Sequence, residues 1–326
     1  MKIVWSDQKV DDECHIKIVW LDQNQQLRIP ISWYHYLQEW ISKIADVKFY
    51  GVGGGRFTPE VDVPTIVEKE NPDMVVCWST QISFRGVEKI DTFKCCKCSD
   101  AHDDNFERHI KFLNYNKINI AALAVYESLV EKYQQRCPNT KFFRFNSGLE
   151  HTRFIDKEYT DRPWDCSFVG STGANYYPLR VKIINTLKQN QDIKFYFRHL
   201  DIRTVTQAEW NIEIDNQVEL LNRTKITPFS NGIYNYPVQR WHEGFACGCL
   251  VIAERPLDAE ALHLVPYYNY VPIDKNHFMG QIRYYLEHEE ERMKIVRNAK
   301  DTFLKYNTIE IRAKELLSKF TELCNG

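Results

Sequence analysis

The chain has 326 residues, of which 44% are hydrophobic, and its 42 Lys and Arg against 44 Asp and Glu give a net charge of −2. This balance disfavours strong non-specific binding to nucleic acid, which needs many unneutralised basic side chains. No apolar run approaches the ~20 residues of a membrane helix, the first residues resemble a strand and not a signal peptide, and the ten cysteines lack regular spacing. We therefore expect a cytoplasmic protein with reduced thiols and with room for two domains.

Strand-like and helix-like segments alternate along the first half of the chain. The motif Lys-Ile-Val-Trp-x-Asp-Gln occurs at residues 2–8 and again at 17–23. We interpret it as two similar strands that can form a hairpin, because two copies are too few for a repeat fold. The other predicted elements are strands at 48–52, 74–78, 92–96 and 142–145, and helices at 32–44, 105–114 and 124–136. Such alternation is typical of parallel sheets with helices on both faces.

A polar, turn-rich segment at 146–164 is interpreted as a linker, and the alternation restarts after it. The predicted strands that follow are 166–169, 193–197, 225–227 and 249–252, and the predicted helices are 178–188, 218–222, one that starts at Pro237, 275–287, 289–304 and 309–323. The sequence therefore predicts one domain at 1–150, a second at 151–305 and a C-terminal helical segment at 306–326.

The most informative stretch runs from residue 235 to residue 252. Pro237 suits the first turn of a helix, and Arg240 and Glu243 stand at i and i+3, so both project from one helix face. Gly248 can end that helix, and the apolar residues 250–252 are typical of a buried parallel strand. A cation and a carboxylate near a helix start, before a strand of an α/β sheet, suit a ligand that carries both phosphates and sugar hydroxyls.

A second pattern lies at residues 164–180, where a predicted strand ends in Gly170, Ser171 and Thr172 and a helix begins at Pro178. This arrangement leaves backbone N–H groups and a helix N-terminus at the carboxyl edge of the sheet, where anions bind. Arg180 can add a charge-assisted contact to a phosphate. The alternative is an ordinary strand-to-helix loop with a surface arginine.

The order of these motifs along the chain resembles the spore-maturation-protein-like branch of the GT-B glycosyltransferases. The matching residues run from Phe145-Asn-Ser-Gly148 through Asp165-Cys-Ser-Phe-Val-Gly-Ser171 to Arg240, Glu243 and Cys247-Gly248. The turn at 170–171 and the Arg-x-x-Glu helix are also similar to those of phage DNA β-glucosyltransferase. The resemblance implies an α/β fold of the GT-B type, with two Rossmann-like domains whose parallel sheets face a central cleft. It places the acceptor on the N-terminal domain, the donor on the C-terminal domain, and a last helix that crosses back between them.

The resemblance also implies roles for individual residues. Arg240 would contact the donor diphosphate and Glu243 the ribose hydroxyls. The full set of predicted donor-binding residues is Gly170, Ser171, Thr172, Arg180, Arg198, Asn235, Tyr236, Arg240 and Glu243. Large retaining GT-B families carry a Glu-x7-Glu pair, and Asn235 stands at its first position here, which leaves the anomeric outcome open. Asn235 can hydrogen-bond a sugar hydroxyl, or it can cap a turn.

The loop at 99–104 follows a predicted strand and would face the cleft of a two-domain transferase. An inverting transfer needs a base that accepts the proton of the acceptor hydroxyl, and Asp100 and His102 are the candidates for this catalytic role. The alternative is a solvated acidic loop that caps the helix at 105–114.

Other signals are weak. Arg56 breaks the dinucleotide-binding spacing in the glycine run at 51–55, and the cysteines at 95–98 lack a second cluster at zinc spacing. No convincing Asp-x-Asp motif follows a predicted strand. We therefore expect no metal site and no cofactor other than a nucleotide diphosphate sugar, UDP- or GDP-linked, that serves as co-substrate.

The resulting hypothesis is a metal-independent glycosyltransferase whose partners are the nucleotide-sugar donor and a hydroxyl of a glycan, protein or small-molecule acceptor. One alternative is a DNA-modifying glucosyltransferase that acts on hydroxymethylated bases, although the balanced charge makes nucleic acid a weaker partner. The second is a non-catalytic nucleotide-sugar-binding protein. A sugar-nucleotide epimerase of the same fold is a lesser alternative.

Overall fold

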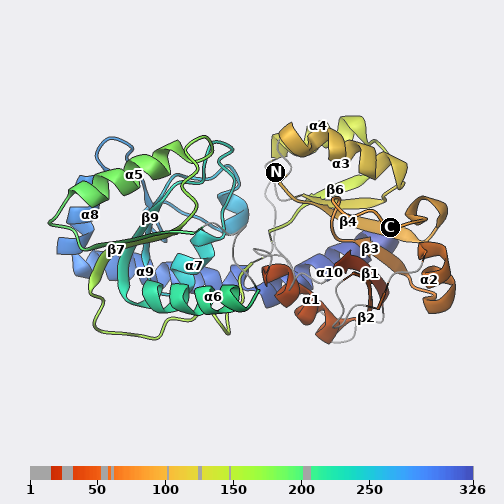
Figure 1. Cartoon of the computed structure of the whole chain (residues 1–326), viewed down its shortest axis with the longest axis horizontal. Coiled ribbons are helices and arrows are strands. Elements are labelled where there is room, and N and C mark those ends of the chain that lie inside the picture. The colour runs from red at the N-terminus through yellow and green to blue at the C-terminus, as the bar shows by residue number, and fades with distance from the viewer. Residues whose placement is uncertain are drawn as a thin grey trace.

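The computed structural model describes residues 16–23, 32–52, 58–59, 62–100, 103–123, 127–146, 148–200 and 207–325. These residues form two α/β domains that lie side by side (Figure 1), and each domain is built on one parallel sheet. The predicted α/β class with two parallel sheets is therefore confirmed.

The N-terminal sheet has six strands in the order β2-β1-β3-β4-β5-β6. Its strands are β1 (Lys17–Gln23), β2 (Asp46–Val52), β3 (Met74–Cys77), β4 (Phe93–Cys98), β5 (Ile120–Leu123) and β6 (Lys141–Arg144). Its helices are α1 (Ser32–Ile44), α2 (Val63–Glu70), α3 (Asp103–Tyr115) and α4 (Glu127–Arg136). β3 and β5 are buried at every residue, because helices cover both faces of a parallel sheet and its inner strands never meet water.

The C-terminal sheet has five strands in the order β11-β10-β9-β7-β8. Its strands are β7 (Trp164–Gly170), β8 (Phe195–His199), β9 (Thr224–Phe229), β10 (Leu250–Ala253) and β11 (Val271–Pro272). Its helices are α5 (Pro178–Gln189), α6 (Gln207–Asn222), α7 (Arg240–Ala246), α8 (Phe278–Glu287) and α9 (Glu289–Thr302). The strand order reverses between β7 and β9, and such a switch point opens a crevice at the carboxyl edge, where open α/β sheets bind ligands.

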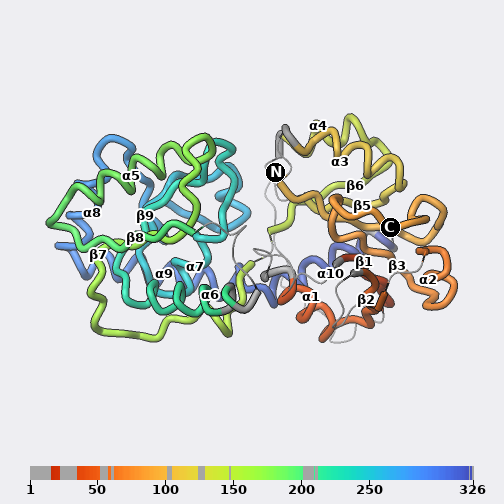
Figure 2. The backbone as a smooth tube through the Cα atoms, in the orientation of Figure 1, coloured from red at the N-terminus to blue at the C-terminus, as the bar shows by residue number. Residues whose placement is uncertain are grey.

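Two segments connect the domains, and they pair with each other. The Leu149 N–H donates to the Asn307 carbonyl at 3.1 Å, and the Ile309 N–H donates to the Leu149 carbonyl at 2.9 Å. The last helix, α10 (Ile309–Asn325), then packs into the N-terminal domain, where Leu316 and Phe320 share one buried cluster with the α1 side chains. Figure 2 shows this blue end of the chain running from the C-terminal domain to the N-terminal one.

Several predicted elements differ from those observed. β5 and α2 were not predicted, and α6 begins at Gln207 where the sequence indicated a short helix from residue 218. α7 begins at Arg240 with Gln239 as its N-cap, so the prediction that Pro237 forms its first turn is wrong. The predicted strand at 2–8 lies outside the described residues. β1 pairs with β2 along one edge and with β3 along the other, which leaves no edge for the suggested hairpin.

Candidate functional site

The site begins with the two loops that follow β7 and β9 at the switch point of the C-terminal sheet. Arg180, near the start of α5, joins them: its Nη1 donates to the Ser171 carbonyl at 2.9 Å, and its Nη2 donates to the Ser230 carbonyl at 2.9 Å. The side chain is 5% exposed and its guanidinium lies 3.5 Å from the centre of the Tyr177 ring. Arg180 therefore holds the shape of both loops.

Arg240, the first residue of α7, reaches across the end of β7. Its Nη2 donates to the Val169 carbonyl, and its guanidinium lies 4.4 Å from the centre of the Phe168 ring. A Cβ on Gly170 would overlap this guanidinium, and Gly170 has φ +145, a conformation that L side chains rarely adopt. The glycine that ends β7 is thus what allows Arg240 to approach the strand.

Glu243 lies one turn along α7, with its carboxylate 3.8 Å from Nη1 of Arg240. From α6, the side-chain amide of Gln217 donates to the same carboxylate oxygen at 2.6 Å. The side chains of Arg240 and Glu243 are 18% and 14% exposed, so the pair is mostly buried yet open to a ligand. Gln217 was not among the predicted site residues, because the helix predicted there started one residue later.

The electrostatics of this group favour an anion. Burial and the charge of Arg240 together lower the pKa of Arg180 to about 10. Burial also lowers the pKa of Arg240, against the opposing effect of Glu243, and it raises the pKa of the Glu243 carboxyl. The Arg180 and Arg240 guanidinium groups thus repel each other in a poorly solvated place, and a phosphate there would relieve this repulsion.

The other predicted donor-binding residues have different surroundings. The Thr172 hydroxyl lies 3.1 Å from Nδ1 of His199, which ties the β7 loop to the end of β8, and Ser171 is exposed. Arg198 forms an ion pair with Glu213 of α6, and this hydrogen-bonded carboxylate raises the pKa of Arg198. In this structure the Arg198 guanidinium is therefore engaged by the protein itself.

Asn235 is also engaged by the protein. It has a left-handed backbone with φ 48. Its amide donates to the Arg255 carbonyl at 3.0 Å, and its side-chain oxygen accepts from Asn231 at 3.0 Å. Both polar atoms of the Asn235 side chain are therefore engaged by the protein itself, in a turn that precedes the Gln239 N-cap of α7.

A cavity of about 320 Å³ joins the two domains. Asp100, which follows β4 with φ 49, lines it from the N-terminal domain. The C-terminal domain contributes Tyr176, Tyr177, Asn231, Gly232, Ile233, Tyr234 and Tyr236. Burial raises the pKa of Tyr236, and the charge of Asp100 and a side-chain hydrogen bond with it raise this pKa further. The structure thus brings the candidate base Asp100 and the candidate donor residue Tyr236 together, whereas His102 lies outside the described residues.

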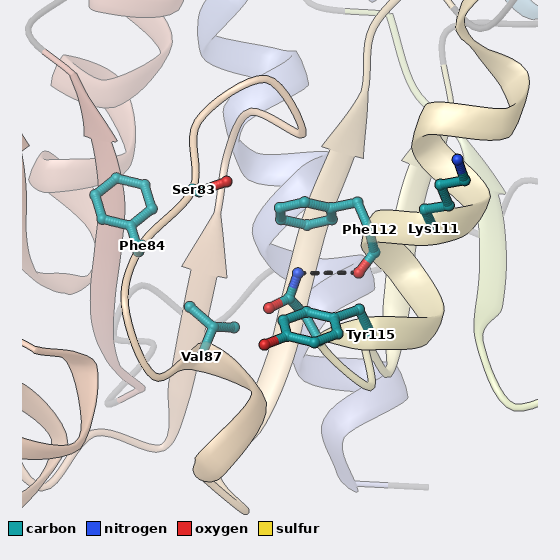
Figure 3. Close-up of a pocket in the computed structure, with 7 residues that line it drawn as sticks. Ser83, Phe84, Val87, Lys111, Phe112 and Tyr115 are labelled. Atoms are coloured by element: carbon teal, nitrogen blue, oxygen red, sulfur yellow. Dashed lines mark hydrogen bonds between the residues drawn. The ribbon is translucent and has the colours of Figure 1, made fainter.

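A second cavity, of about 440 Å³, lies at the far end of α3 from Asp100. Phe112 and Tyr115 of α3 face the loop that carries Ser83 and Val87 (Figure 3). It belongs to the N-terminal domain alone and has no part in the site.

The described residues hold neither a candidate metal cluster nor a membrane-spanning helix. They contain no group of three or more His, Cys, Asp and Glu side chains placed to hold a metal ion, and the three cysteines of β4 are buried in the sheet. No helix in the described ranges has the length and apolar character needed to cross a bilayer.

Comparison with known proteins gives a family match and a set of similar folds. Residues 180–318 match the family model described as glycosyl transferase-like. A glycosyltransferase from Rickettsia africae ESF-5 superposes with TM-score 0.62 at 11% identity, covering 95% of this chain and 98% of that one. Anabaena HepE in complex with UDP gives TM-score 0.63 at 11% identity, covering 94% and 100%.

A third similar structure is sucrose-phosphate synthase from Thermosynechococcus elongatus, with TM-score 0.62, 9% identity, and 94% and 99% of the two chains covered. None of the curated proteins matches the chain in sequence. At these identities the structural likeness establishes the fold, and it does so over nearly the whole length of each chain.

Proposed function

We propose that this chain, which has a GT-B-type fold and matches a glycosyl transferase-like family model at residues 180–318, moves a sugar from a UDP-linked donor to a hydroxyl acceptor without a metal ion. The observation that carries this proposal is the Arg240–Glu243 pair at the switch point, where Gly170 leaves room for the guanidinium. Anabaena HepE, which shares the fold, binds UDP and UDP-glucose, which favours UDP over GDP as the donor nucleotide.

Donor binding follows from the charges of the site. The diphosphate lies against Arg240, and the ribose hydroxyls donate to the Glu243 carboxylate, which Gln217 holds in place. α5 begins without a side-chain N-cap, so its first N–H groups add to the positive potential near the phosphates. Arg180 acts indirectly, because its hydrogen bonds to Ser171 and Ser230 keep the loops in the shape that receives the donor.

Transfer then requires charge stabilisation and a base. As the anomeric carbon leaves the diphosphate, negative charge grows on the phosphate oxygens, and the fixed positive charge of Arg240 stabilises it without reorganisation. In an inverting transfer, Asp100 accepts the proton of the attacking hydroxyl from across the cleft. Its place in the cavity that joins the domains supports this role.

A thermal-shift screen with UDP, GDP, TDP, CMP and their sugar conjugates, with and without EDTA, tests the donor site. A ligand at 100 times its dissociation constant adds about 2.7 kcal/mol to the free energy of unfolding. We expect a shift with UDP and UDP-sugars that EDTA leaves unchanged and that Glu243→Ala abolishes. A shift that requires a metal ion, or no shift with any nucleotide, would contradict the proposal.

A further inference from the structure

The cavity between the domains differs in chemistry from the donor site beside it. Four of its lining side chains are tyrosines, and the rings of Tyr234 and Tyr236 stack with centres 6.4 Å apart and planes 20° apart. Tyr176 and Ile233 are 51% and 54% exposed. Aromatic surface that stays exposed inside a cleft is typical of a ligand site.

The charge of this cavity is opposite to that of the donor site. Asp100 lines it, and none of the other described lining residues is a lysine or arginine. Arg180 lies close by, but it packs against the Tyr177 ring at 3.5 Å and donates to backbone carbonyls at the base of the loops. The cavity therefore presents aromatic faces, hydroxyls and one negative charge.

These features identify the chemical class of the acceptor. The C–H bonds of a pyranose are weakly positive and pack against the negative face of an aromatic ring, while its hydroxyls can donate to the oxygens of a carboxylate such as Asp100. A nucleic acid also stacks on aromatic rings, but its phosphates need cations, and Asp100 would repel them. A cavity of about 320 Å³ is at the small end of ligand sites, which suits a sugar unit better than a folded protein.

We infer that this cavity binds the acceptor, and that the acceptor is a neutral carbohydrate whose ring packs on Tyr176 and Tyr234 with a hydroxyl directed at Asp100. The inference rests on the proposed transferase function. In the transfer, the acceptor oxygen forms a bond to the anomeric carbon, and the bond from that carbon to the diphosphate oxygen breaks. The electron pair leaves with UDP, and the proton of the hydroxyl passes to the Asp100 carboxylate.

Saturation-transfer NMR on the full chain with UDP tests the inference. The probes are maltose, cellobiose and lactose as neutral sugars, a sulfated disaccharide, and a duplex containing 5-hydroxymethylcytosine. We expect saturation transfer to at least one neutral sugar and to neither anion. Tyr176→Ala should weaken that binding about two- to tenfold, as the loss of one ring contact implies. Tyr176 is half exposed, so the variant should fold, and Tyr115→Ala, at a 67% exposed tyrosine far from the cleft, is the matched control.

The outcomes separate the two proposals. If UDP binds but no neutral sugar receives saturation, or if Tyr176→Ala and Tyr115→Ala bind the sugar equally well, the acceptor inference is overturned and the donor site stands. Preferential binding of the duplex or the sulfated sugar also overturns it, in favour of a polyanionic acceptor. If UDP itself fails to bind, the donor site is overturned and the inference falls with it.

Discussion

Substitution of Gly170 by alanine is the perturbation that tests the donor site most cleanly, because it changes no charge. The new Cβ would overlap the Arg240 guanidinium, and φ +145 is itself strained for alanine. The end of a flexible side chain moves more easily than the backbone, so we expect the Arg240 guanidinium to move away from β7. A misplacement on the order of 1 Å costs ~10²-fold in function.

The magnitude follows from the contact that is lost. A hydrogen bond to a charged group contributes about 1.5–3 kcal/mol, so Gly170→Ala should weaken UDP binding about 10- to 100-fold. The strained backbone should also lower the free energy of unfolding by about 1–3 kcal/mol. Isothermal titration calorimetry with UDP measures the first effect, and urea denaturation measures the second.

Gly86→Ala is the matched control. Gly86 has φ +89, and a Cβ there would meet Pro64 Cδ at 2.6 Å, but it lies in the N-terminal domain, away from the donor site. We expect a similar loss of stability with unchanged UDP affinity. If Gly170→Ala binds UDP like the wild type, or if Gly86→Ala weakens it as much, the assignment of Arg240 to the donor is refuted.

Three further predictions concern the base, the support of Glu243 and a buried histidine. Asp100→Asn should lower kcat by about 10²–10⁴ with UDP affinity unchanged, and loss of UDP binding instead would argue against a base role. Gln217→Leu should weaken UDP binding by about tenfold, because it removes the 2.6 Å hydrogen bond that orients Glu243; calorimetry showing wild-type affinity would contradict this. Burial and Arg312 lower the pKa of His242 to about 3. Below pH 6.5 the His242 side chain therefore binds a proton in the unfolded chain but not in the folded chain. The free energy of unfolding falls as the pH drops. The protonation of His242 in the unfolded chain should thus lower the free energy of unfolding by about 2 kcal/mol between pH 7 and pH 5. Urea denaturation at the two pH values measures this loss, and the His242→Leu variant should not show it.

The fold class could be predicted because strand-like and helix-like segments alternate along the chain. The short elements could not be predicted in this way. β5 is a run of four apolar residues, Ile-Ala-Ala-Leu, and such a run also suits a helix. α2 does carry local helix signals in the sequence, because Asp62 caps its N-terminus and Pro64 lies in its first turn. α7 begins at Arg240, three residues after Pro237, and the segment before it is held by a contact between distant loops, in which Leu257 N–H donates to the Asn235 carbonyl at 2.9 Å.

For the candidate site, the spacing of neighbouring residues in the sequence predicted the local geometry, but it did not predict the long-range contacts. Arg240 and Glu243 were expected on one helix face, and their charged groups lie 3.8 Å apart. The contact of Arg180 with a carbonyl fifty residues away depends on how β7 and β9 lie together, which no local pattern encodes. For the same reason, the sequence did not indicate that Asp100 lines one cavity with the tyrosines of the other domain.

The central claim is that the chain cleaves a nucleotide sugar at this site without a metal ion. The most direct measurement is the release of nucleotide diphosphate from UDP-, GDP- and TDP-sugars in the presence of EDTA, with neutral disaccharides as acceptors, for the wild type and Glu243→Ala. We predict release from a UDP-sugar that EDTA does not diminish and that the variant loses. Release from none of these donors by the folded chain, or release that disappears with EDTA, would contradict the account.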